Sequence, residues 1–401
     1  MFGRQQRVNT DPAATKKLLS RGVEEVFVRE NLEKKLQSGK ALRIKLGFDP
    51  TGPKIHIGRA IILRKLREFQ ELGHTAVFVV GDFTARIGDP SDKLEKRPTL
   101  TVAQIAENLK TYKKQVGKIL DINKAEFHHN SKWLSKLTFG EITELADSFS
   151  IQQMSARRNF KERIEKGEEV SLKETLYPLM QGYDSVAVKA DIEIGGFDQL
   201  FNLKAGRIIQ RQYGHAEQDI LTTSMLEGTD GRKMSTSWGN IISIVDEPSD
   251  MFGKAMSLKD SLILKYFLLC TDISDAEIES IKKSLINETN PRDIKMRLAR
   301  EIVTLYHGTE AAKRAEEQFV RIFSKAEFPA DAPVKEVKKG ALLIDVISDI
   351  AGSKSELNRL LVEGAVFDYK SQTKITNRKV MVEKDLDLRV GKHRFVRVKV
   401  S

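Results

Sequence analysis

Residues 43–80 read RIKLGFDPTGPKIHIGRAIILRKLREFQELGHTAVFVV, and this stretch decides the fold. RIKLGF at 43–48 and TAVFVV at 75–80 are short apolar runs of the kind found in buried strands. Between them, apolar residues follow helical spacing from Gly58 and stop at Gly73, a residue that favours a helix end. A strand, a turn, a helix and a second strand in this order form the unit of a parallel, doubly wound sheet.

Outside this unit the pattern is mostly helical. Helical segments are predicted over residues 13–40, 101–186 and 247–325, and ADIEIGGFDQ at 190–199 returns to strand and loop. Residues 326–339 carry two prolines among polar side chains, which indicates a linker. Two short helices and then alternating strands are predicted after it.

Composition excludes several classes of protein. The 401 residues suggest roughly two to four domains. Hydrophobic residues make up 40% and charged residues 31%, which excludes disorder throughout. The single cysteine, Cys270, cannot form an internal disulfide or a thiol cluster for a metal. No stretch of about 18 apolar residues could span a bilayer, and the polar start lacks the apolar core of a secretory signal. We therefore expect a cytoplasmic protein with no membrane partner.

The charge is unevenly distributed. Lys and Arg number 67 against 56 acidic residues, a net charge of +11, which favours polyanionic partners. Residues 335–401 hold 15 Lys and Arg against 9 Asp and Glu, so +6 of that charge lies in the last sixth of the chain. This basic C-terminal module is a candidate for nucleic-acid contact.

The segment TGPKIHIGR at 51–59 lies between the first strand and the start of the helix. Backbone N–H groups at a helix start are unpaired, and the helix dipole favours an anion there. Gly58 lets a flat base or a phosphate approach the backbone, and His56 and Thr51 can donate to phosphate oxygens. Taken alone, the pattern also fits a structural histidine at a turn.

A second candidate is GRKMSTS at 231–237, a small, hydroxylated and basic stretch with glycines around it. Such a loop can fold over a polyphosphate, where Lys233 would neutralise charge. Taken alone, this loop is unremarkable.

In this order, the two segments resemble the HIGH and KMSKS signatures of class I aminoacyl-tRNA synthetases. The resemblance covers nearly the whole chain. The stretches KLGFDPTGPKIHIG, GDFTARIGDPS, YPLMQGYDSV, IGGFDQLFN and GTDGRKMSTS occur in the order and spacing of bacterial tyrosyl-tRNA synthetases. The tail SKSELNRLLVEGAV is similar to a small helix-pair RNA-binding module of a ribosomal protein, which bacterial members carry at the same end.

The resemblance implies an activity. Tyrosine would be adenylated by ATP, and the tyrosyl group would then pass to the 3′ end of tRNA(Tyr). No protein nucleophile is needed, because the substrate carboxylate attacks the α-phosphate. Mg²⁺ would accompany ATP, bound mainly by phosphate oxygens and water, and we name no protein ligand for it. Members of the family are homodimers joined through a helical insertion.

The resemblance also implies an architecture. Residues 1–242 would form an α/β catalytic domain, a doubly wound, Rossmann-like parallel sheet with a helical insertion. An all-α anticodon-binding domain would follow at 243–326, then the linker at 327–339. A small α+β RNA-binding domain would end the chain at 340–401.

Roles toward ATP are carried over from the family by position. His56 would stabilise the α-phosphate under attack, Thr51 would assist at the γ-phosphate, and Lys233 would bind the departing pyrophosphate. The other implied ATP-binding residues are Gly58, Arg59, Lys93, Arg97, Asp198 and Thr236.

Amino-acid choice depends on Tyr177, Gln181 and Asp184, whose spacing of four and three places them on one helix face. In the family this face lines the substrate pocket. Tyr177, Gln181 and Asp89 would receive the α-ammonium, Gln199 would lie at the carboxyl region, and Asp184 would accept the phenol hydrogen bond. A carboxylate that phenylalanine would leave unpaired explains how phenylalanine is rejected.

Three positions depart from the usual family pattern. Arg59 stands at the fourth position of HIGH, where histidine is usual, and remains a phosphate donor. Thr236 replaces the second lysine of KMSKS, so the loop keeps one cation. Lys45 stands where many bacterial relatives place a tyrosine that touches the phenol, and a subgroup of the family carries lysine there. We expect Lys45 to pair with Asp184 or with the phenol oxygen.

Two rival interpretations remain open at this stage. One is a tryptophanyl-type or other class I adenylating enzyme, and the other is a non-catalytic RNA-binding paralogue, which Arg59 and Thr236 alone favour. In the basic tail, Lys354, Arg359 and Lys379 are candidates for contacts with the RNA backbone.

Overall fold

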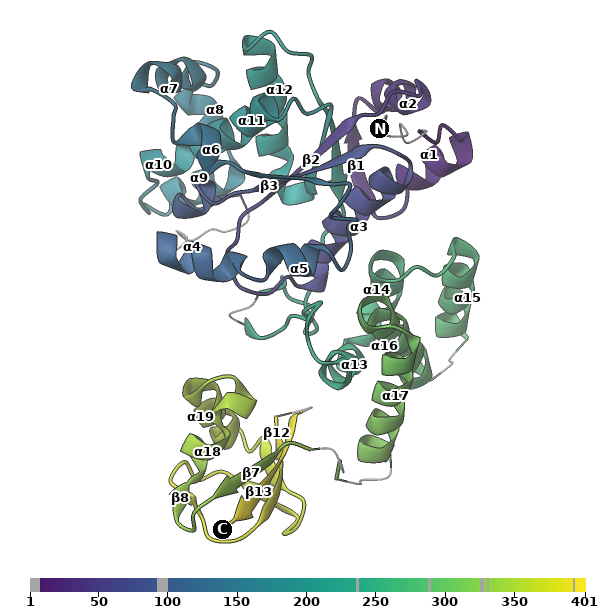
Figure 1. Ribbon diagram of the computed structural model, residues 1–401, viewed down its shortest axis with the longest axis vertical. Coiled ribbons are helices and arrows are strands. Elements are labelled where there is room, and N and C mark those ends of the chain that lie inside the picture. Colours follow the sequence, from purple (N-terminus) through teal and green to yellow (C-terminus); the bar gives the residue numbers. More distant parts are fainter. Residues whose placement is uncertain are drawn as a thin grey trace. The chain divides into compact units, whose positions relative to one another are not determined.

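The structure is a computed structural model that describes residues 8–91, 100–235, 238–287, 290–324, 328–329, 332–391 and 394–401. The chain forms two compact units (Figure 1). The first unit contains residues 1–227 and 233–245, and the second contains residues 228–232 and 246–401.

The first unit is built on a six-stranded sheet with the order β1-β6-β5-β2-β3-β4. All neighbours are parallel except β1, which pairs antiparallel with β6 at the edge. The strands are β1 (Val23–Phe27), β2 (Arg43–Phe48), β3 (Thr75–Val80), β4 (Glu126–His129), β5 (Ile192–Gly196) and β6 (Asp219–Thr223). The strands predicted at 43–48 and 75–80 are confirmed, and so is the helix between them, α3 (Ile57–Glu71).

Register brings the ends of three strands to one edge of the sheet. Strands β2 and β3 pair from Arg43 with Thr75 to Phe48 with Val80, and Lys45 lies opposite Glu193 on β5. The aligned carboxyl ends of parallel strands are where α/β proteins bind ligands.

The helix predicted over residues 13–40 is wrong in its middle. The structure has α1 (Pro12–Leu18), then strand β1, then α2 (Arg29–Gln37). The helix α1 ends at Leu18, Gly22 at φ 68° lies in the turn that follows, and the Val-rich stretch after it pairs with β6. That partner lies almost 200 residues further along the chain, so local helical propensity misled the prediction.

Short helices fill the segment between β4 and α11. Three of them begin with capping boxes, at Thr138, Ser150 and Ser171, where the side-chain oxygen accepts from a backbone N–H inside the helix and the third helical residue bonds back. The remaining helices of the first unit are α4 (Val102–Leu109), α5 (Tyr112–Val116), α6 (Ser131–Leu134), α7 (Phe139–Ala146), α8 (Ile151–Ser155), α9 (Arg158–Glu165), α10 (Leu172–Thr175), α11 (Tyr177–Ala187) and α12 (Leu200–Gln212), with 3₁₀ turns at Thr84–Arg86 and Phe197–Gln199.

Helices α11 and α12 pack closely side by side, and α12 contacts β5 and β6. A Cβ atom added at Gly182 of α11 would lie 2.5 Å from Ile209 Cδ1 and 3.3 Å from the Ala205 backbone of α12, so any larger residue would require Ile209 to shift. The close packing fixes which face of α11 is directed toward the end of the sheet.

The second unit begins with helices that lie within the stretch predicted to be helical. They are α13 (Pro248–Met256), α14 (Ile263–Cys270), α15 (Asp275–Ile286), α16 (Pro291–His307) and α17 (Thr309–Ser324), with a 3₁₀ turn at Asp260–Leu262. Their buried residues include Phe252, Tyr266, Phe267 and Leu298, each of which is 0% exposed. Among the described residues, none of the helices combines the length and hydropathy that crossing a membrane requires.

The last part of the second unit combines two helices with short strands, as predicted. A five-stranded sheet has the order β10-β9-β12-β13-β7, and β11 pairs with β8. Leu343, Ile347, Leu357 and Val396 lie in its apolar core. The elements are β7 (Val334–Val337), β8 (Ala341–Leu342), α18 (Leu343–Ala351), α19 (Lys354–Val362), β9 (Val366–Asp368), β10 (Thr373–Ile375), β11 (Met381–Val382), β12 (Leu386–Val390) and β13 (Arg394–Val400).

The prediction of a linker up to residue 339 is wrong at its C-terminal end. Strand β7 lies inside that stretch and pairs in parallel with β13. Ala332 also packs in a small apolar cluster with Ile322 and Phe395. The pairing partner of β7 is the last strand of the chain, which local composition could not indicate.

Candidate active site

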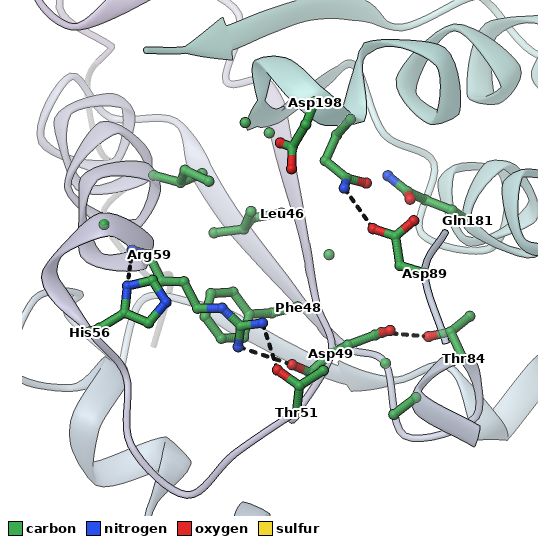
Figure 2. Close-up of a pocket in the computed structure, with 18 of the residues that line it drawn as sticks. Leu46, Phe48, Asp49, Thr51, His56, Arg59, Thr84, Asp89, Gln181 and Asp198 are labelled. Carbon is green, nitrogen blue, oxygen red and sulfur yellow. Dashed lines mark hydrogen bonds between the residues drawn. The ribbon is translucent and has the colours of Figure 1, made fainter. Parts of the chain in front are cut away.

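A cavity of about 490 Å³ opens in the first unit where β2, β3 and β5 end (Figure 2). Its wall combines the strand ends with the start of α3, one face of α11, the turn at 197–199 and residues 233–235. The predicted site residues that line it are Thr51, His56, Gly58, Arg59, Asp89, Tyr177, Gln181, Asp184, Asp198, Gln199 and Lys233. Lys93, Arg97 and Thr236 were also predicted and lie outside the described residues.

His56 is the N-cap of α3, and its Nδ1 accepts a hydrogen bond of 3.3 Å from the backbone N–H of Arg59. Burial, together with the positive charge of Arg59, lowers the pKa of His56 to about 3. The imidazole is therefore neutral at physiological pH. Because Nδ1 accepts, the ring proton resides on Nε2, which leaves one N–H donor.

A side chain at Gly58 would crowd two neighbouring side chains. A Cβ atom there would lie 3.1 Å from His56 Nδ1 and 3.1 Å from Met234 Sδ. The first turn of α3 thus presents bare backbone to the cavity, as expected for a surface that a flat base approaches.

Arg59 folds back over the segment that precedes the helix (Figure 2). Its Nη2 donates to Thr51 Oγ1 at 2.7 Å and its Nη1 donates to the Asp49 carbonyl at 3.3 Å. The guanidinium lies 4.8 Å from the centre of the Phe48 ring. The cation is thereby held beside Thr51 at the wall of the cavity.

Asp49 was quoted in the sequence motif without a role, and in the structure its carboxylate accepts hydrogen bonds from Tyr177 and Thr84. Its Oδ2 accepts from Tyr177 Oη at 2.9 Å and its Oδ1 from Thr84 Oγ1 at 2.7 Å. A Cβ atom at Gly81 would lie 1.9 Å from Asp49 Oδ1, so this position requires glycine. A carboxylate directly after a strand of a parallel sheet was the signal that could have found Asp49.

The loop that contains Lys233 is held by Asn240. Asn240 Nδ2 donates to the Lys233 carbonyl at 3.0 Å, and its Oδ1 accepts from the Ser235 N–H at 2.8 Å. Lys233 is exposed and lines the cavity. One buried amide therefore fixes the backbone on both sides of Met234.

Asp184 lies on the cavity wall and is almost fully buried. Its Oδ1 accepts from Trp133 Nε1 at 2.7 Å, and its Oδ2 accepts from Asn130 Nδ2 at 3.2 Å. Burial raises the pKa of Asp184 to about 7, and the charge of Lys45 and both hydrogen bonds oppose the rise. The carboxylate is oriented and near the middle of its titration at neutral pH.

Asp89, Gln181 and Gln199 converge around Asn202, a residue that the sequence analysis did not single out. Gln199 Nε2 donates to Asp89 Oδ2 at 2.6 Å. Asn202 Nδ2 lies within 3.4 Å of Asp89 Oδ1 and 3.1 Å of Gln181 Oε1 and Gln199 Oε1, and 3.0 Å from Ser91 Oγ. An amide nitrogen carries two hydrogens, so these acceptors outnumber its donors. The cluster suits a ligand rich in N–H groups.

Comparison with known proteins agrees with this geometry. A family described as tRNA synthetases class I (W and Y) matches residues 37–324. The tyrosine–tRNA ligase of Thermotoga maritima is 46% identical over 393 residues, which cover 96% of this chain and 98% of that protein. The chain belongs to the tyrosyl-tRNA synthetase family of class I.

Further relatives extend this similarity to other bacteria. The tyrosine–tRNA ligase of Carboxydothermus hydrogenoformans is 44% identical, with 95% of this chain and 96% of the relative covered. Among solved structures, a C-terminally truncated mitochondrial tyrosyl-tRNA synthetase of Aspergillus nidulans matches with a TM-score of 0.64 at 23% identity, over 80% of this chain and 95% of that one. The tyrosyl-tRNA synthetase of Archaeoglobus fulgidus, complexed with L-tyrosine, matches with a TM-score of 0.60 at 22% identity. This match covers 76% of this chain and 99% of that one. These likenesses show the class I synthetase fold.

One residue of this synthetase does not behave as predicted. Lys45 was expected to pair with Asp184 or with the phenol oxygen, and in the structure its ion pair is with Glu193 and not with Asp184. Its Nζ lies 2.9 Å from Glu193 Oε1 and donates to the Gln181 carbonyl at 2.7 Å and Ser185 Oγ at 2.8 Å. The side chain is 0% exposed, and Lys45 is not among the described residues that line the cavity. Leu46 and Gly47, which are nearer the end of β2, line the cavity instead, and Lys45 lies behind its wall against α11.

Sequence reasoning also missed the two residues that hold the Asp184 carboxylate, Asn130 and Trp133. Both follow β4, the last strand at that edge of the sheet. A polar residue after a strand end was again the available signal, but the helical prediction over 101–186 hid this strand.

The three basic residues predicted to touch RNA are exposed. Lys354 forms an ion pair with Asp345 at 2.6 Å, and Arg359 pairs with Glu356 at 2.7 Å and with Glu363 at 2.9 Å. Lys379 lies between β10 and β11. Carboxylates around the guanidinium of Arg359 make it a weaker candidate for a phosphate than Lys379.

Proposed function

We propose that this chain is a tyrosine–tRNA ligase. It activates L-tyrosine with ATP to tyrosyl-adenylate and pyrophosphate, and transfers the tyrosyl group to the 3′ end of tRNA(Tyr). The observation that carries this proposal is the Asp184 carboxylate, which Trp133 and Asn130 orient on the wall of the cavity.

A buried, oriented acceptor selects among aromatic amino acids. A phenol hydroxyl donates to Asp184 and replaces the water that the carboxylate loses. Phenylalanine has no such donor, so its binding leaves the carboxylate unpaired. An unpaired buried group of this kind can lower kcat/KM for phenylalanine about 10⁴–10⁵-fold relative to tyrosine. The Asp89, Gln181 and Gln199 cluster receives the ammonium group, because these residues line the cavity and their carboxylate and amide oxygens have lone pairs for further donors.

Activation is a displacement at phosphorus. A carboxylate oxygen of tyrosine attacks the α-phosphorus of ATP, the bond to the bridging oxygen breaks, and pyrophosphate leaves with the electron pair. Neutral His56 donates from Nε2 to the α-phosphate, and Thr51 and Arg59 lie on the side of the γ-phosphate. Lys233 stabilises charge on the leaving pyrophosphate. Asp198 accepts from the ribose, and Gly58 leaves room for the adenine. Positioning and electrostatics account for all these roles.

Mg²⁺ enters with ATP in this proposal. The described residues contain no group of three or more His, Cys, Asp or Glu side chains arranged for a metal ion. The donor set that remains is the phosphate oxygens of ATP and water, which suits the preference of Mg²⁺ for retained waters. The ion supplies charge neutralisation on the phosphates.

Transfer requires a tRNA. A ribose hydroxyl at its 3′ end attacks the tyrosyl carbonyl carbon, and AMP leaves. The helices α13–α17 are the proposed anticodon-binding part, and the segment from β7 to the C-terminus, with its net charge of +6 from residue 335, is the proposed second RNA-binding part.

The proposal includes a homodimer and a cytoplasmic location. Support for the dimer comes from large apolar side chains on the short helices between β4 and α11. Phe139 and Ile151 are each 81% exposed, and Leu172 is 76% exposed. Such side chains mark protein interfaces. Sedimentation of the native chain, compared with that of a variant in which all three residues are changed to Ser, tests the proposed dimer.

The proposed location is the cytoplasm, because the proposed product, tyrosyl-tRNA(Tyr), would be used there.

Exchange of labelled pyrophosphate into ATP tests the activity. Exchange that depends on tyrosine supports the proposal, and exchange that depends on tryptophan instead favours the tryptophanyl-type alternative. Absence of exchange with any amino acid favours the non-catalytic paralogue. Charging of tRNA(Tyr) by the same preparation tests the second step.

A further inference from the structure

A buried ion pair lies behind the wall of the amino-acid cavity. Lys45 on β2 and Glu193 on β5 are opposite each other in the sheet, with 2.9 Å between Nζ and Oε1, and both side chains are 0% exposed. Neither residue is among those described that line the cavity.

Each polar atom of the pair is used. The three N–H groups of Lys45 have three acceptors, namely Glu193 Oε1, the Gln181 carbonyl and Ser185 Oγ. Glu193 Oε1 also accepts from Gln181 Nε2 at 3.1 Å, and its Oε2 accepts from Ser185 Oγ at 3.1 Å and Gln218 Nε2 at 2.5 Å. Lys45 thus has no N–H left for a substrate.

Stability alone is a poor reason for such a pair. Two charges removed from water lose hydration, and apolar replacement of both is often neutral or stabilising. The pair instead makes a specific demand on α11. A carboxylate only accepts, so the Gln181 amide nitrogen must face Glu193. The amide oxygen is then directed toward Asn202, at 3.1 Å, which also bonds Asp89 and Gln199 of the cavity lining.

We propose that Lys45 and Glu193 are a positioning pair for tyrosine recognition, which fixes the Gln181 amide with its oxygen toward the substrate ammonium. The inference rests on the proposed function. Without the pair, the amide can turn and present N–H groups to a cation. Lys45 also bonds Gln181 and Ser185 on α11, the helix that carries Tyr177 and Asp184, so it fixes that helix against the sheet.

The test replaces both charges with side chains of similar shape, in the variant Lys45→Met with Glu193→Gln. The expected result is a KM for tyrosine raised about tenfold, the scale of one lost charge-assisted hydrogen bond. The KM for ATP and kcat in pyrophosphate exchange remain near those of the native chain.

A control uses a second ion pair that includes a residue of β2. Arg43 of β2 bonds Glu126 of β4 at 2.6 and 2.7 Å, away from the described cavity lining. The variant Arg43→Met with Glu126→Gln removes one positive and one negative charge from the same sheet and should leave the KM for tyrosine unchanged. An equal rise in both double variants would overturn the proposal, because it would report general loss of rigidity.

A second comparison locates the effect at Gln181. In a Gln181→Met background, replacing Lys45 and Glu193 should raise the KM for tyrosine no further, since the side chain through which they act is gone. A full additional rise overturns the proposal, and so does an unchanged KM in the first double variant.

Folding is controlled with a milder variant. If the double variant does not fold, Glu193→Gln alone is measured. The Gln218 amide can then rotate, because its Oε1 has no hydrogen-bond donor among the described residues. Loss of the fold in this variant too assigns the pair to folding and overturns the proposal. Absence of tyrosine-dependent exchange in the native chain would overturn the proposed function itself, which separates the two failures.

Discussion

Arg59 Nη2 donates a hydrogen bond of 2.7 Å to Thr51 Oγ1, which joins the first turn of α3 to the segment that precedes it. Arg59, at the fourth position of the HIGH signature, therefore keeps its side chain at the wall of the cavity. Its charge lies where the terminal phosphates of ATP are proposed to bind, in a chain that has Thr236 in place of the second lysine of KMSKS.

Replacement of Arg59 by Met should slow tyrosyl-adenylate formation by about 10²-fold, the usual effect of removing one preorganised donor. The KM for tyrosine should not change, because Arg59 makes no bond to α11. Stopped-flow or exchange kinetics measure both quantities. Arg67→Met is the control, since Arg67 lies on the same helix and pairs with Glu71 at 2.7 Å. An unaltered rate in Arg59→Met would remove the residue from the ATP site.

Lys233→Ala should lower the rate of adenylate formation by about 10²–10³-fold and leave tyrosine binding intact. The neighbouring Arg232→Ala is the control, because Arg232 is exposed and pairs with Asp230 at 2.6 Å. Asn240→Ala should cause a smaller loss of rate through the loop backbone that Asn240 holds. A Lys233→Ala enzyme that binds tyrosine poorly but activates it normally would contradict this role.

Asp184→Asn should relax the choice between tyrosine and phenylalanine by about 10–100-fold, since a hydrogen bond to a charged group contributes about 1.5–3 kcal/mol. The ratio of kcat/KM for the two amino acids in pyrophosphate exchange measures it. Discrimination equal to that of the native chain would place the phenol elsewhere.

The titration of Asp184 should appear in tyrosine binding. Its pKa of about 7 exceeds its ordinary value of 3.8, mainly through burial. The protonated form predominates below pH 7 in the empty site and cannot accept as a carboxylate, so the KM for tyrosine should fall as the pH rises from 6 to 8. In the empty enzyme, the same shift favours the folded state at low pH, and this contribution is lost as the pH rises through 7. Asp184→Asn should abolish the KM trend.

His74 should make the fold less stable in acid. Burial lowers its pKa from 6.5 to about 4, so between these values the unfolded chain binds a proton that the folded chain does not. Stability is therefore full above pH 6.5 and is lost as the pH falls through 4. Urea midpoints at pH 7 and pH 5 should differ less in His74→Gln than in the native chain. Equal differences would show that His74 does not contribute.

The basic tail should contribute to tRNA binding. Replacement of Lys354, Arg359 and Lys379 by Ala should weaken tRNA affinity and flatten its salt dependence, with Lys379 contributing most, while tyrosine activation is unchanged. Three lysines exposed on α1 and α2, Lys16, Lys17 and Lys34, provide a control of equal charge. Identical salt slopes for all three proteins would remove the tail from the RNA interface.

Local patterns predicted the centre of the fold. Strands β2 and β3 and helix α3 follow from apolar spacing and glycine positions, and His56 and Gly58 follow from their place at the helix start. Strands β1 and β7 did not follow, because each is a strand only when paired with a partner made much later in the chain.

The same limit applies to the site. Side chains on one helix face, such as Tyr177 and Asp184, could be grouped from spacing. Asn202 and Trp133 could not, because their partners are more than 50 residues away or come from several elements. Lys45 was assigned from its position in a motif, whereas its place depends on Glu193 and Ser185, acceptors that lie more than 100 residues further along the chain.

The pairing of β7 with β13 has a consequence for how the chain is made. Strand β13 lies inside the five-stranded sheet, between β12 and β7, and follows every other strand of that sheet along the chain. This sheet therefore closes only after β13 has been synthesised and has left the ribosome. The six-stranded sheet, complete at Thr223, has its last strand long before then. Domains of a nascent chain fold as they emerge, so the order of synthesis alone would let the amino-acid cavity form first and the basic tail last.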